Sequence, residues 1–176
     1  AKNGQTIHFY PTNKIRIPVD KNTIIKNKVV NPQYYDSIVP FIDIDIKGGL
    51  YKSRLMMLDI LANNDWKRPI YFTGGSFGDD DYLWMKDYLQ LDGLVYKLVP
   101  VKTPIDKENP YDMGDIDSYK MYDIVMKWSW GNGDLTTIYH DPETRKNSIS
   151  YRTNMARLME QLINEGKTGK AKKIID

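Results

Sequence analysis

The chain begins with alternating apolar and polar positions that predict extended strands. The alternation has a period of two over residues 6–10 and again over 14–20, around a turn at residues 11–13, and a strand shows this period. We therefore expect an N-terminal β-hairpin, in which Pro18 confines the second strand to an edge or a bulge. The asparagines and prolines of residues 21–40 then predict a loop.

From residue 41 onward the pattern alternates between strands and helices. Short apolar runs predict three strands, over residues 41–46, 68–73 and 94–99. Longer stretches between them predict two helices, one over 53–63 with Ser53 as its N-cap and one over 79–92. This order is typical of right-handed βαβ crossovers. The predicted fold is therefore α/β, with a small mixed, partly parallel sheet and flanking helices.

The last third of the chain is predicted to be helical. Apolar stripes indicate helices over residues 118–128 and 151–165, and Gly166 is expected to end the second one. A further helix begins near residue 168 and stops part-way, which predicts a helical hairpin. Its apolar residues Ala171, Ile174 and Ile175 lack an obvious partner, so we expect the chain to be a piece of a larger protein.

The predicted organisation has three parts. They are an N-terminal β-hairpin and loop packed on the main domain, an α/β domain, and the start of a helical tail, with the boundaries 1–40, 41–150 and 151–176.

Composition narrows the classes of function. The 176 residues contain no cysteine, which excludes a disulfide scaffold and a thiol nucleophile. The 25 basic and 23 acidic residues leave a net charge of +2, which does not favour nucleic-acid binding. No apolar run in the sequence approaches the roughly 20 residues that a membrane span needs.

A glycine-rich loop at residues 73–78 lies where α/β folds often bind ligands, between a strand and a helix. The aspartates that follow would repel phosphate, and the loop matches no phosphate-binding motif. A hydroxyl-rich ligand or a cation suits acidic oxygens better. The alternative is that Asp79 or Asp80 simply caps the helix. The candidate ligand-binding residues of this region are Thr73, Gly75, Ser76, Asp79, Asp80 and Asp81.

Two further groups of residues are candidates for catalysis or ligand binding. Asp43 and Asp45 share one strand face, where a pair of carboxylates can serve as acid and base, or can simply discourage edge pairing. Trp128 and Trp130 could form a sugar platform or belong to the core. The two histidines are too far apart in sequence to suggest a metal site. No cofactor, metal or catalytic residue is predicted.

Two long strings, residues 55–72 and 88–102, carry a family resemblance. They resemble the C-terminal soluble region of large multi-pass membrane proteins common in Bacteroidetes, a family of unknown function related to protein O-mannosyltransferases of the GT-C glycosyltransferase class. Residues 154–173 look like the start of that family's TPR-like helical tail. The resemblance covers most of residues 41–176.

The resemblance implies an accessory domain on the extracytoplasmic (periplasmic) face of the inner membrane. It would bind an acceptor protein or glycan, or the membrane-embedded catalytic part of the same polypeptide, and no nucleic acid. The family's acidic catalytic residue lies near the first membrane spans, so no catalytic residue is carried over to this chain. A TPR-like hairpin implies a concave surface for peptides.

The residues leave two other functions open. An independent carbohydrate-active hydrolase would use Asp43 and Asp45, or the aspartates at 79–81, at glycosidase separation. A carbohydrate-binding module would instead show exposed tryptophans, among them Trp84, Trp128 or Trp130.

Overall fold

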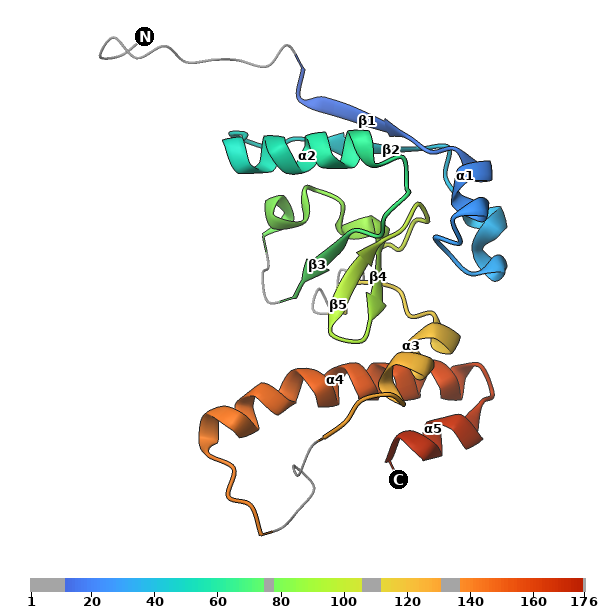
Figure 1. Ribbon diagram of the computed structural model, residues 1–176, viewed down its shortest axis with the longest axis vertical. Coiled ribbons are helices and arrows are strands. Elements are labelled where there is room, and N and C mark those ends of the chain that lie inside the picture. The colour runs from blue at the N-terminus through green and yellow to red at the C-terminus, as the bar shows by residue number, and fades with distance from the viewer. Residues whose placement is uncertain (1–11, 75–77, 106–111, 131–136, 176) are drawn as a thin grey trace, which may run out of the picture.

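The computed structural model describes residues 12–74, 78–105, 112–130 and 137–175. Its elements form three tiers along the long axis of the molecule (Figure 1). The first tier holds two strands and a helix: β1 (Lys14–Pro18), β2 (Phe41–Asp45) and α2 (Lys52–Asn64). The middle tier is a small sheet of β3 (Tyr71–Thr73), β4 (Leu89–Asp92) and β5 (Val95–Leu98). The last tier holds α3 (Ser118–Val125), α4 (Pro142–Asn164) and α5 (Thr168–Ile175).

The first tier shows strict strand alternation. β1 and β2 pair antiparallel, with Ile17 opposite Ile42 and Arg16 opposite Asp43. Ile42 and Ile44 are buried, whereas the residues between them are exposed. The strand predicted over 14–20 is confirmed in position, and β2 is its partner. The other strand of the predicted hairpin, at residues 6–10, lies outside the described residues.

The region predicted as a loop contains two short helical segments. Helix α1 (Lys21–Lys26) begins at Asp20, whose carboxylate accepts from the backbone N–H groups of Asn22 and Thr23. The 3₁₀ helix η2 (Pro32–Ser37) follows, with its proline in the first turn. The expectation of a plain loop was wrong here, because the Asp20 cap and the buried side chain of Ile24 stabilise a helical turn.

The middle sheet is antiparallel, in the order β3-β5-β4. The predicted α/β class is confirmed, because the fold combines helices with small sheets. The expectation of βαβ crossovers and of a partly parallel sheet was wrong, because the neighbouring strands pair antiparallel. A single isolated bridge, between Gln90 and Asp115, is parallel. β4 and β5 instead form a hairpin around Gly93, which has a φ of +72°, and a Cβ added there would lie 3.0 Å from Ile124.

The helix expected over residues 79–92 is also wrong. The chain forms two short 3₁₀ helices, η3 (Asp79–Tyr82) and η4 (Lys86–Tyr88), and then enters β4. Leu83 and Trp84 both adopt positive φ, at 53° and 58°, which interrupts a helix. The buried apolar side chains of this segment are Tyr82, Leu83, Met85, Leu89 and Leu91, whereas Asp79, Asp81 and Asp87 are exposed.

The last tier is a helical pair docked on α3. Helix α4 begins at Pro142 rather than at residue 151, and Asp141 caps it. Gly166 follows α4 with a φ of +73°, as predicted for the residue after its end. Ala171 and Ile174 are buried against α4 residues, so the expectation that they lack a partner was wrong, whereas Ile175 is exposed.

Two cores hold the tiers together. One joins β1, β2 and α2 to the middle sheet, and the other joins Leu91 of that sheet to α3, α4 and α5. Within the described ranges, no helix combines the length and apolar character that crossing a membrane requires.

Candidate functional site

The strand carboxylates form an ion pair at the surface. Arg16 donates to both carboxylate oxygens of Asp43, at 2.7 and 2.8 Å, and its guanidinium stacks 3.7 Å from the centre of the Phe41 ring. The hydrogen bond from Arg16 holds the pKa of Asp43 below its usual value. Asp45 is exposed on the same strand face, where its backbone is paired with Lys14.

The aspartates after the glycine loop have an arginine partner as well. Arg54 in the first turn of α2 lies 2.6 Å from Asp80 and 3.0 Å from Asp81. Gly78 precedes η3, and no side chain caps this short helix, so the predicted capping role of Asp79 or Asp80 was wrong. Thr73 ends β3 with an exposed side chain. Gly75 and Ser76 lie outside the described residues.

One face of the middle sheet carries buried polar side chains that the sequence pattern did not single out. Gln90, Asp92 and Lys97 are each about 5 to 6% exposed. Lys120 pairs with Asp92, and Lys97 donates to the carbonyl of Val29. Burial lowers the pKa of Lys97 to about 8. A sequence signal was present in β4, where Gln90 and Asp92 alternate with two leucines, but the burial of these polar side chains depends on the segments that cover them.

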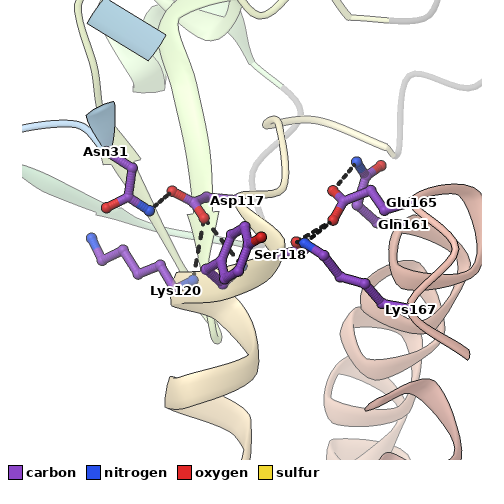
Figure 2. Close-up of polar contacts among 8 residues, drawn as sticks. Asn31, Asp117, Ser118, Lys120, Gln161, Glu165 and Lys167 are labelled. Carbon is purple, nitrogen blue, oxygen red and sulfur yellow. Dashed lines mark hydrogen bonds and ion pairs between the residues drawn. The ribbon is translucent and has the colours of Figure 1, made fainter. Parts of the chain in front are cut away.

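A polar junction connects this face to the helical tail (Figure 2). Asp117 caps α3 by accepting from the backbone N–H groups of Tyr119 and Lys120, and it also accepts from the Asn31 side chain. Next to it, the Ser118 hydroxyl donates to Glu165 at 2.5 Å. Lys167 contacts the same two residues, and Gln161 donates to Glu165 at 2.8 Å. The junction fixes the α4–α5 turn against the start of α3.

A cavity of about 150 Å³ lies beside α1 and α2. Lys28, Lys67, Arg68 and Lys97 line it, together with the residues at the C-terminal ends of the two helices. The negative end of a helix dipole favours cations, so these basic side chains complement the helix ends.

A larger groove, of about 1040 Å³, runs along the N-terminal half of α4. Three aromatic rings form its wall: Trp128 and Trp130 lie edge-to-face with centroids 5.8 Å apart, and Tyr151 lies 5.3 and 5.8 Å from them. Trp130 is 52% exposed. The structure thus brings together the two tryptophans singled out in the sequence and adds Tyr151, which no short spacing could have revealed.

The groove continues a buried face of α4. A stripe with spacings of three and four residues lies on one side of the helix, and consists of Thr144, Ser148, Tyr151, Met155, Leu158 and Leu162. Leu158 and Leu162 are fully buried in the second core. Toward the N-terminus the same stripe changes to hydroxyl side chains, and there it lines the groove.

The polar lining of the groove is rich in hydrogen-bond donors. Arg145, Arg152, Asn147 and His140 belong to this lining, and no carboxylate is found among the lining residues that the structure describes. Among the described residues, His140 Nε2 is buried without a hydrogen-bond partner. The arrangement offers flat apolar surface and donors to one ligand, which is the composition of a binding site.

A known protein family matches the first two thirds of the chain. A family model described as TMEM260-associated domain 2 matches residues 1–120. The chain belongs to this family. In this TMEM260-associated domain the match contains both sheets and reaches the first residues of α3, so it includes residues 1–40, which the sequence resemblance left out. The aromatic rings of the groove follow the matched range. No curated protein and no solved structure matches the chain.

Proposed function

We propose that the chain is an accessory binding domain of a membrane-bound protein that resembles O-mannosyltransferases, and that it holds the acceptor protein in the aromatic groove. Membership of a TMEM260-related family supports the link to such proteins. In this proposal the domain works on the extracytoplasmic, periplasmic face of the inner membrane. The membrane-embedded part of the same polypeptide is its second partner.

The observation that carries the proposal is the groove itself. Its three aromatic rings present apolar surface beside Asn147, Ser148 and the two arginines, a composition suited to binding rather than to bond cleavage. Aromatic residues with adaptable polar neighbours are enriched where proteins bind polypeptides.

The hydrolase alternative has less support. Asp43 is held by Arg16, and its lowered pKa is the opposite of what a general acid needs. Asp80 and Asp81 are bound to Arg54. Three of the five candidate carboxylates, Asp43, Asp80 and Asp81, therefore form ion pairs with arginine.

A carbohydrate-binding role is the second candidate. Burial of all four tryptophans would remove it, but Trp130 is 52% exposed and Trp66, Trp84 and Trp128 are only partly buried. Sugar rings also stack on exposed aromatic side chains, so a glycan on the acceptor could occupy the same groove.

The test uses the full-length membrane protein in its own host. Trp130→Ala and Tyr151→Ala remove the rings of the groove, while Ile149→Ala changes an exposed side chain of α4 outside the lining. We expect both ring variants to lower glycosylation of envelope proteins, measured by mass spectrometry at equal abundance of the membrane protein. Unchanged glycosylation in the two ring variants would overturn the proposed function.

A further inference from the structure

Two arginines, Arg145 and Arg152, line the aromatic groove, and among the described residues that line it there is no aspartate or glutamate. In the part of the chain that the structure describes, neither arginine forms an ion pair with a carboxylate. Three other arginines, Arg16, Arg54 and Arg157, each contact an aspartate.

The whole C-terminal region shares this bias. From residue 142 to residue 176 the sequence contains eight lysines and arginines against three glutamates and one aspartate, although the complete chain carries only +2. A positive groove in a nearly neutral chain attracts anionic partners and disfavours cationic ones.

The two arginines of the groove lie at a fixed distance from each other along α4. Arg145 and Arg152 are seven residues apart on α4, so their backbone positions are separated by about 10 Å along the helix. In an extended polyproline-type segment, side chains three residues apart lie on one face at roughly 9 Å. Such a segment can place one carboxylate on each arginine. A side chain between the two carboxylates points to the side of that face, where the rings of Trp128, Trp130 and Tyr151 form the wall of the groove.

We propose that the groove binds an acidic polypeptide segment with two carboxylates three residues apart and an apolar or aromatic side chain between them. The inference rests on the proposed function, because it names the chemistry of the acceptor segment that the groove holds. Each arginine can donate two hydrogen bonds to one carboxylate of the segment.

The direct test is titration of the chain with synthetic peptides, followed by tryptophan fluorescence and calorimetry. One peptide carries Asp-x-Phe-Asp in a neutral background, a second replaces both aspartates by lysine, and a third places the aspartates side by side. We expect the first to bind at least about tenfold more tightly than the other two, and to weaken when salt is raised from about 50 to about 300 mM.

Matched variants of the chain show which side chains bind the acidic peptide. Arg145→Gln with Arg152→Gln should weaken binding of the acidic peptide by about tenfold or more, whereas Lys146→Gln, on the same helix but outside the lining, should leave it unchanged. Thermal unfolding of each variant shows that it is folded. Equal binding of the lysine peptide, or no loss in the double arginine variant, overturns the inference.

The outcomes separate this inference from the proposed function. If a neutral peptide binds, depends on Trp130 and ignores the arginines, the groove still holds polypeptide and only its acidic preference is wrong. If oligomannose binds and none of the peptides does, the acidic segment is excluded and the carbohydrate-binding candidate is favoured. If Trp130→Ala changes no binding of any probe, both proposals fail.

Discussion

The two halves of α4 share one continuous face but use it differently. In the C-terminal half, Leu158 and Leu162 are fully buried and Arg157 donates to the carbonyls of Met113 and Gly114 at 3.0 and 2.8 Å. In the N-terminal half, residues 142–150 are exposed apart from the half-buried Ser148. The same helical stripe therefore completes a core at one end and lines a groove at the other. The change from leucine to serine and threonine sets the difference.

The largest expected effect contrasts a leucine with a serine on this stripe. Leu158→Ala should lower the free energy of unfolding by about 3 kcal/mol, because it removes buried methyl groups and leaves a cavity. Ser148→Ala, on the same face in the groove, should change it by less than about 0.5 kcal/mol. Urea unfolding followed by circular dichroism measures both, and similar losses in the two variants would contradict the contrast.

The next effect concerns the polar junction at the buried end of α4. Ser118 is 1% exposed and donates to Glu165, so Ser118→Ala should reduce the free energy of unfolding by about 1.5 kcal/mol, through loss of a hydrogen bond to a charged group. Ser150→Ala, at an exposed position in the other half, is the matched control and should be nearly neutral. If Ser150→Ala lowers the free energy of unfolding as much as Ser118→Ala does, the hydrogen bond from Ser118 to Glu165 does not stabilise the junction.

A smaller effect tests the turn that closes the buried half. Gly166 has a φ of +73°, so Gly166→Ala should destabilise by about 1 kcal/mol even though the space around it is open. Gly169 lies in α5 with ordinary φ and equally open space, and Gly169→Ala should stabilise by about 0.5 kcal/mol. Thermal unfolding of the two variants should shift in opposite directions; shifts of the same sign would refute the assigned backbone role.

The smallest effect lies at the open end, where Asp141 caps α4. The hydrogen bonds from the backbone N–H and hydroxyl of Thr144 hold the pKa of Asp141 below its ordinary value. A carboxylate with a lowered pKa stabilises the fold above its unfolded pKa and loses that contribution as pH falls through its folded pKa. The first turn of α4 should therefore fray in acid, well before the turn that contains Leu158.

Amide hydrogen exchange of residues 143–147, followed by NMR from about pH 5 to about pH 2.5, measures this fraying. Asp141→Asn keeps a capping side chain without a titrating group. Its first turn should show a weaker dependence on acid than the wild type. Identical pH profiles for the two proteins would mean that Asp141 does not hold the open end.

The parts of this fold that local pattern decides could be predicted from the sequence. β2 follows from the strict alternation around Asp43 and Asp45, and Gly166 follows from the end of an apolar stripe. The segment over residues 79–92 could not be predicted, because the left-handed Leu83 and Trp84 and the burial of its apolar side chains override its helical composition. Tertiary surroundings decide such segments.

The candidate site shows the same limit. Trp128 and Trp130 could be named because they are close in sequence, but Tyr151 joins them only through the return of the chain in α4. The buried charges of Asp92 and Lys97 were also hidden, since α3 and the segment at Val29 must cover the sheet before those residues become interior.

Asn154 has a consequence for the order in which the molecule assembles. Its side chain donates to the carbonyl of Gly93 at 2.8 Å, across 61 positions of sequence, whereas α4 and α5 contact each other across a turn of a few residues. Closing a long loop is slower than forming a neighbouring pair of helices. Contacts within the helical pair are therefore expected to form before the pair docks on the Gly93 hairpin, and that docking is expected as a late step of folding.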